Sequence, residues 1–133
     1  FGTYKKGYEL LIEAGIDVIP HITVGLDEGD IVGEYDAIDA VSRAEKIILN
    51  TLIPSDFGDT VSIEDYLSVV KYAVENTGAD IIIGCMRERG RSDLEIESIK
   101  QGVKGIVIPS KRTKNWAKKR YDIKEHRTCC AVQ

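Results

Sequence analysis

Three cysteines are the residues of this sequence with the most distinctive chemistry. Cys85 follows an apolar run, and Cys129 and Cys130 are adjacent. Three thiolates that meet in space could hold an iron–sulfur cluster with its fourth iron left open. Adjacent cysteines chelate a single Zn²⁺ poorly, and no C-x-x-C spacing is present. The spacing therefore leaves two interpretations open: a three-cysteine cluster site, or a buried Cys85 together with a redox-sensitive tail.

Arg87, Arg89 and Arg91 come just after the same apolar run. Guanidinium groups bind carboxylates and phosphates in a bidentate manner, so this spacing predicts an anion site. The alternative is salt bridging to the acidic N-terminal half. His21 is a candidate ligand or base, although a single histidine on a strand more often has a hydrogen-bonded place in the core. The sequence contains no Walker-type phosphate loop, dinucleotide fingerprint or nucleophile elbow.

The elements that must position these residues alternate between apolar runs and helical periodicity. Strands are predicted at residues 17–24, 46–53, 80–84 and 103–108, with continuously apolar sequences. Helices are predicted before, between and after them. Ser62 with Asp65, and Ser92 with Glu95, resemble capping boxes that start two of these helices, and Ser110 or Thr113 caps the last. This alternation predicts an α/β fold with four parallel β/α units, preceded by a helix.

Two architectures fit four such units: a small open α/β sheet, or half of an eight-stranded β/α barrel, which normally needs about 250 residues. The only methionine is Met86, so the sequence does not begin with an initiator residue, and this favours the half-barrel. We expect a half-barrel domain over residues 1–125 and a cysteine-containing tail over 126–133. Function in such folds lies at the C-terminal strand ends. The polar residues predicted there include His21, Thr23, Gly25, Glu28, Asn50, Cys85 and Ser110.

The charge is unevenly distributed. Residues 1–80 hold 5 Lys/Arg and 16 Asp/Glu, a formal charge of −11, whereas residues 81–133 hold 13 and 6, a formal charge of +7. The basic stretch around Trp116 could track a phosphate backbone or form a solvated helix face, and the net charge of −4 does not favour nucleic acid. No apolar run approaches the roughly 20 residues of a membrane span. No signal peptide is visible, and the odd cysteine number favours a reducing, cytoplasmic setting.

One stretch carries a family resemblance. The residues YKKGYELLIEAGIDV at 4–18 and VGLDE at 24–28 resemble biotin synthase and its radical S-adenosylmethionine relatives. In that group a helix ending in Ala-Gly-Ile leads into the fifth barrel strand, which closes with G-x-I-x-G-x-x-E. Here Gly25 and Glu28 match the pattern, while His21 replaces the first glycine and Thr23 the isoleucine. The segment from Ile47 through Pro54 to Thr60 resembles the sixth strand and its loop.

The resemblance extends to archaeal biotin synthase homologues, some of them lipoyl synthases, which have a Cys-Met-Arg-x-Arg-Gly motif and a Cys-Cys tail. Residues 85–90 and 129–130 match these. The resemblance implies roles for three groups of residues. They are an auxiliary [4Fe-4S] cluster on Cys85, Cys129 and Cys130; an S-adenosylmethionine pocket at Gly25, Glu28 and Asn50; and substrate contacts from Arg87, Arg89, Arg91 and His21. The C-x3-C-x2-C motif of the cleaving cluster is absent, so this chain alone is not expected to cleave S-adenosylmethionine.

The resemblance thus implies the C-terminal half-barrel of a transferase that inserts sulfur, as in lipoyl or biotin formation. Its substrate would be a small molecule or a group bound to a carrier protein, and its partner the N-terminal half-barrel. Two alternatives remain open. One is another radical reaction of cofactor biosynthesis, such as methylation or ring assembly. The other is a non-catalytic half-barrel that self-associates as a homodimer.

Overall fold

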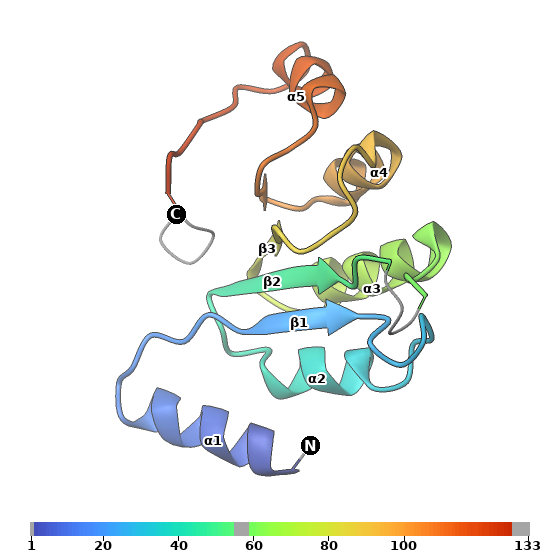
Figure 1. Cartoon of the computed structure of the whole chain (residues 1–133). Coiled ribbons are helices and arrows are strands. Elements are labelled where there is room, and N and C mark those ends of the chain that lie inside the picture. Colours follow the sequence, from blue (N-terminus) through green and yellow to red (C-terminus); the bar gives the residue numbers. More distant parts are fainter. Residues whose placement is uncertain (1, 55–58, 129–133) are drawn as a thin grey trace.

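The computed structural model describes residues 2–54 and 59–128 of the chain, and Figure 1 shows that helices and strands alternate along them. The strands are β1 (His21–Val24), β2 (Lys46–Thr51), β3 (Asp80–Ile83) and β4 (Gly105–Ile106). The helices are α1 (Gly2–Glu13), α2 (Glu34–Ala40), α3 (Ile63–Asn76), α4 (Ser92–Gln101) and α5 (Lys111–Lys118). The predicted α/β class is therefore confirmed.

The four strands form one parallel sheet in the order β1-β2-β3-β4, so strands that follow one another in the chain are neighbours. The register pairs His21 with Ile48, Lys46 with Asp80 and Ile82 with Gly105. Parallel neighbours need a crossover, and α2, α3 and α4 supply the three crossovers. Within the described residues, β1 and β4 each have a neighbouring strand on one side only.

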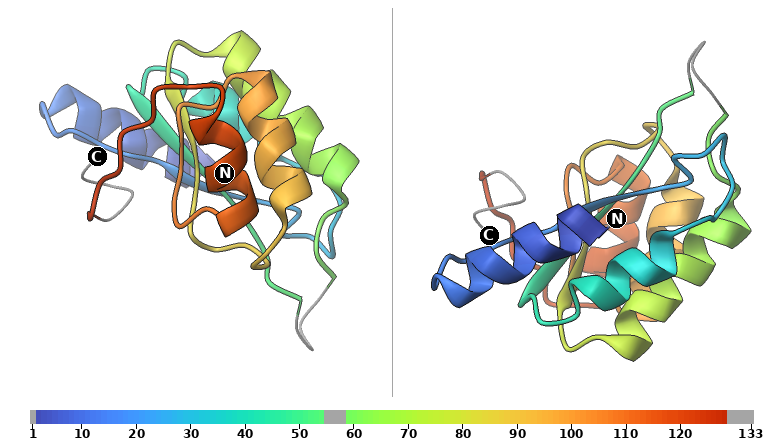
Figure 2. Two further views of the ribbon diagram at one scale, coloured as in Figure 1. Left: turned by 90° about the horizontal axis from the view of Figure 1, so that it is seen from above. Right: turned by 90° about the horizontal axis from the view of Figure 1, so that it is seen from below.

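The helices pack against one face of the sheet. Contacts run from α2 to α3, from α3 to α4 and from α4 to α5, and Figures 1 and 2 show these helices following one another around the sheet. Apolar residues of the strands face them and are buried: Ile22, Val24, Ile47, Leu49, Ile81 and Ile83. From the helices, Ile38, Val69, Val70 and Leu94 complete this core. Burial on this side accounts for every second apolar residue of the strands, since successive side chains point to opposite faces.

The opposite face carries a smaller apolar cluster. Ile48, Ile82 and Val107 are buried there, with the partly buried Ile19 packed against them, and no helix residue belongs to the cluster. Side chains alternate along a strand, so Thr23 and Asn50, which are partners in the register, lie on this same face near the C-terminal strand ends. We call it the open face of the sheet.

All four strands are shorter than predicted, since β2, β3 and β4 end at Thr51, Ile83 and Ile106, and one predicted helix cap is not formed. The first strand begins at His21, not at residue 17, directly after Pro20, which has no N–H to donate to the sheet. The second difference concerns α4: Arg91 is its N-cap and makes no side-chain cap hydrogen bond, so the expected capping box at Ser92 is not formed. By contrast, Ser62 does cap α3, accepting a hydrogen bond from the N–H of Asp65 at 3.1 Å. Likewise, Ser110 caps α5.

None of the helices in the described part of the chain is long and apolar enough to cross a membrane.

Replacing Leu49 with alanine tests the helix-facing core. Leu49 lies in the middle of β2 and is fully buried, so Leu49→Ala should lower the free energy of unfolding by about 2–5 kcal/mol because it leaves a cavity. Leu26, which is 65% exposed, provides a matched control, and Leu26→Ala should change it by less than about 0.5 kcal/mol. Urea denaturation followed by circular dichroism measures both, and equal effects would contradict the described packing.

Candidate functional site

The loop after β1 is held by a buried glutamate. The carboxylate of Glu34, at the start of α2, accepts hydrogen bonds from the N–H groups of Gly25 at 2.8 Å, Val32 at 2.9 Å and Gly33 at 3.0 Å. A carboxylate bound to three backbone donors fixes both ends of a loop. The predicted cofactor residue Gly25 therefore has its N–H engaged within the protein.

Glycine is required at position 25 by its conformation and its surroundings. Gly25 has φ of +72°, and an added Cβ would lie 2.5 Å from Cβ of Val61. This close approach brings the β1 end against the segment that leads into α3. Glu28, three residues further on, is exposed and also has a positive φ, of 52°. Gly25 and Glu28 thus lie in the same loop, where Gly25 is buried and Glu28 is exposed to solvent.

Asn50 occupies the adjacent strand end on the open face. Its side chain is 7% exposed, and its Oδ1 accepts a hydrogen bond from the Met86 N–H at 3.4 Å. The side chain covers the backbone of Gly84, where an added Cβ would overlap Oδ1 of Asn50. The backbone of residues 84–86 therefore folds over Asn50, which accounts for the glycine at the end of β3.

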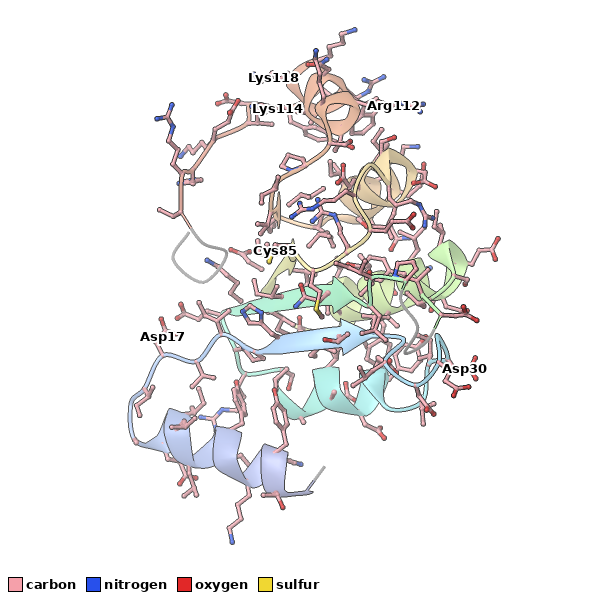
Figure 3. The ribbon with its side chains drawn as sticks, viewed as in Figure 1. Asp17, Asp30, Cys85, Arg112, Lys114 and Lys118 are labelled. Atoms are coloured by element: carbon pink, nitrogen blue, oxygen red, sulfur yellow. The ribbon has the colours of Figure 1, made fainter. Side chains whose placement is uncertain are left out.

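Cys85 lies in this same segment, between two residues that contact Asn50. Its thiol is free and exposed, and Figure 3 shows it directly after β3. One of the two interpretations expected a buried Cys85, and on this point it is wrong because the residue is exposed. Cys129 and Cys130 lie outside the described residues. Within those residues no group of three or more His, Cys, Asp or Glu side chains could hold a metal ion.

The Arg87 side chain is buried and belongs to a hydrogen-bond network. Its side chain is 2% exposed, and Nη2 donates to Oε1 of Glu95 at 2.7 Å. The guanidinium also donates to the carbonyl oxygens of Gly84, of Val107 at 2.8 Å and of Ile108 at 3.0 Å. Glu95 Oε2 in turn accepts from the Ser110 N–H at 2.9 Å. These contacts join the C-terminal ends of β3 and β4 to α4 and to the cap of α5.

The charge state of Glu95 follows from this network. Burial by itself raises the pKa of this carboxyl, but hydrogen bonds from Thr113, Arg87 and Ser110 outweigh burial, so the pKa lies below its ordinary value. Glu95 is therefore ionised at neutral pH and balances the Arg87 cation.

The three arginines do not converge. Arg91 forms ion pairs with Glu88 and Asp93, both at 3.2 Å, and these partners belong to its own segment instead of the acidic N-terminal half. Arg89 is exposed and lies between these two arrangements in sequence. The anion receptor predicted from Arg87, Arg89 and Arg91 together is thus divided into a buried network, a local surface pair and one exposed guanidinium.

His21 also differs from its predicted place. As the first residue of β1 it is exposed at the N-terminal edge of the sheet, the opposite end from Gly25. The structure thus brings Asn50 and Cys85 together, places Gly25 and Glu28 at the neighbouring strand end, and separates His21 from all of them.

Two residues that organise this edge were not predicted. Glu34 and Glu95 are the buried carboxylates that hold the loops after β1 and β3. Each lies in the first turn of a helix, where an acidic residue is ordinary, so the sequence carries no sign that it is buried. The arrangement offers an amide, an exposed thiol and an exposed carboxylate along one edge, which are groups able to bind a polar ligand.

Comparison with known proteins adds no family to this geometry: no family model matches the chain, and neither a curated protein nor a solved structure matches it.

Breaking the buried ion pair should be costly. Arg87→Met leaves Glu95 buried without its cation and three carbonyl oxygens without their donor, so the free energy of unfolding should fall by about 3–5 kcal/mol. Arg89→Met, at an exposed position two residues away, is the matched control and should change it by less than about 0.5 kcal/mol. Urea denaturation compares the two, and a small loss for Arg87→Met would show that the network does not support the fold.

The lowered pKa of Glu95 predicts a dependence of stability on pH. The pKa of Glu95 is lower in the folded chain than the ordinary 4.5. The stability that its carboxylate contributes is therefore fully present above pH 4.5 and is lost as the pH falls through the folded pKa. Glu95→Gln should therefore flatten the loss of stability below pH 4.5. Urea denaturation at stepped pH measures this. Glu125→Gln, at an exposed carboxyl whose pKa Lys114 and Lys118 also lower, should flatten it less.

Proposed function

We propose that this chain forms one half of a β/α barrel in a radical S-adenosylmethionine enzyme of the biotin synthase-like group, and that the enzyme inserts sulfur at an unactivated carbon. The order β1-β2-β3-β4 supports the half-barrel, and the resemblance of residues 4–28 and 85–90 supports the chemistry. In a doubly wound sheet the strand order reverses and helices cover both faces. In a β/α barrel the strands follow chain order and the helices form an outer layer. The described sheet shares its strand order and its layer of helices on one face with the second arrangement, and these two features support the half-barrel proposal.

The sheet edges support a partner that completes the barrel. β1 and β4 each lack a neighbour on one side within the described residues, and closure would require further strands beside them. Two apolar residues of α1, the first helix of the chain, are exposed: Leu10 at 57% and Leu11 at 42%. Covering such surface is favourable, so the N-terminal half-barrel is the partner we propose for it.

The S-adenosylmethionine pocket is proposed at the ends of β1 and β2. Asn50 provides an amide on the open face, Thr23 lies beside it in the register, and Glu28 provides an exposed carboxylate. Oδ1 of Asn50 already accepts from the Met86 N–H, so the amide would serve this cofactor as a hydrogen-bond donor through Nδ2. The Gly25 N–H bonds to Glu34, so this residue would contribute by allowing close approach and not as a donor.

An auxiliary [4Fe-4S] cluster is proposed beside this pocket. Iron–sulfur clusters are held by cysteine thiolates, and Cys85 is an exposed thiol adjacent to the segment that covers Asn50. By the resemblance, Cys129 and Cys130 complete the ligand set, and the bound cluster supplies the inserted sulfur. Arg89 is the exposed guanidinium of the three and is the one we propose for an anionic substrate group, since Arg87 and Arg91 have carboxylate partners.

Anaerobic reconstitution with iron and sulfide tests the cluster. The purified chain should bind iron and sulfide and develop the broad visible absorption of an iron–sulfur cluster, and Cys85→Ser should abolish most of it because a thiolate ligand is lost. Met86→Leu changes the sulfur-containing neighbour and is the matched control, which should retain the absorption.

The assignment would be contradicted if the parent chain, with all three cysteines intact, stayed colourless after reconstitution. Equal cluster content in the parent chain and in Cys85→Ser would also contradict it. Circular dichroism of each variant separates loss of the cluster from loss of the fold.

A further inference from the structure

The helix α5, in the basic C-terminal part of the sequence, carries a positively charged surface. Six residues line a shallow depression there: Lys111, Arg112, Asn115, Trp116, Lys119 and Arg120. No carboxylate is among them. We call this surface the α5 basic face. Figure 3 shows Arg112 on this helix, on the far side of the molecule from α1.

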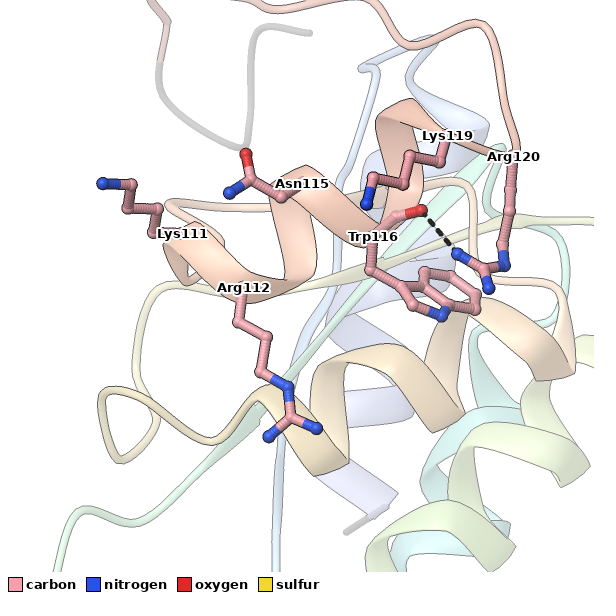
Figure 4. A pocket seen from close by; sticks show the side chains of 6 residues that line it. All are labelled: Lys111, Arg112, Asn115, Trp116, Lys119 and Arg120. Carbon is pink, nitrogen blue, oxygen red and sulfur yellow. Dashed lines mark hydrogen bonds between the residues drawn. The ribbon is translucent and has the colours of Figure 1, made fainter.

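The spacing of these residues places them on one side of the helix. Positions 111, 112, 115, 116 and 119 follow the separations of three and four residues that align side chains along a helix. Arg120 follows the last turn, where its Nη1 donates to the Trp116 carbonyl oxygen at 3.2 Å. Its guanidinium carbon lies 4.5 Å from the Trp116 ring centroid, so a cation–π contact holds the charge in place (Figure 4).

The cations of the α5 basic face are available to a ligand. Lys114 and Lys118, on the same helix, form ion pairs with Glu125 at 2.6 and 3.1 Å. By contrast, within the described parts of the chain Lys111, Arg112, Lys119 and Arg120 form no ion pair, and the Arg120 guanidinium binds the carbonyl oxygen and ring of Trp116. One side of α5 is thus partly neutralised by Glu125, and the other presents four positive charges to solvent.

We propose that the α5 basic face is a docking surface for an acidic segment of another protein, with carboxylates spaced along a helix. Charge complementarity carries this choice, since four cations without carboxylates favour an anionic partner and speed its approach. The patch extends over the eight residues of one helix and its next turn, which matches a short segment.

Two observations favour a protein segment over a nucleic acid. Arg120 covers the Trp116 ring, and base stacking on aromatic rings is a main source of affinity for single strands. The net charge of −4 over the whole chain also disfavours attraction to a long phosphate backbone. This inference does not depend on the proposed function, because none of the candidate site residues lies on α5.

Trp116 is the only tryptophan of the chain, so its fluorescence reports on this surface directly. The full chain is titrated at low salt with a synthetic glutamate-rich helical peptide without aromatic residues. We expect saturable binding that weakens as salt is added, because exposed ion pairs are screened. The double variant Arg112→Gln/Lys119→Gln should weaken binding about tenfold, as expected for two exposed pairs.

The matched control is Lys114→Gln/Lys118→Gln, which removes the same charge from the same helix at positions already paired with Glu125. This control should bind within about twofold of the parent chain. Equal weakening by both double variants would overturn the proposal, as it would reflect net charge alone. Tighter binding of oligo-dT than of the peptide, absence of peptide binding, or sedimentation showing that the chain self-associates through this face would also overturn it.

Discussion

The buried ion pair between Arg87 and Glu95 is the interaction on which the C-terminal half of the structure depends. The strand β4 has only two residues, too few to define its position by strand pairing alone. Arg87 compensates by donating to the carbonyl oxygens of Val107 and Ile108, while Glu95 binds the N–H of Ser110. Two charges that cost free energy to bury separately thus satisfy each other and the backbone beyond β4. The cap of α5, and with it the α5 basic face, follows from that arrangement.

A second buried carboxylate plays the same part at the other end of the sheet. Glu34 binds three N–H groups of the loop after β1, and glycine at 25 lets that loop approach Val61. Both glutamates lie in the first turn of a helix, where the helix dipole favours negative charge. Each draws the polypeptide after a strand back toward the following helix. The C-terminal edge of the sheet is thus built on fixed loops, which is a requirement for any site placed there.

The sequence predicted the element types well because their signals are local. Continuous apolar runs predicted each strand, and Ser62 predicted the cap of α3 that the structure contains. One boundary failed on a local signal: Pro20 has no N–H for the sheet, so β1 begins after it and His21 lies at the N-terminal edge. One cap failed on a tertiary contact: Glu95, which was expected to support a cap at Ser92, binds Arg87 instead. Three arginines at alternate positions suggested one receptor, whereas burial, a local ion pair and solvent separated them.

By itself, the sequence determined the α/β class, the four strands and the uneven charge, since periodicity and composition depend on near neighbours in the chain. Only the tertiary structure decided which polar groups remain available at the strand ends. Gly25 and Arg87 use their donors within the protein, whereas Asn50 and Cys85 come together because residues 84–86 fold over the amide. The tertiary structure likewise pairs Lys114 and Lys118 with Glu125. Arg112 and Lys119 have no carboxylate partner within the described chain. The physical reason is that hydrogen bonds and ion pairs join residues that are distant in sequence, and a linear pattern does not encode those partners.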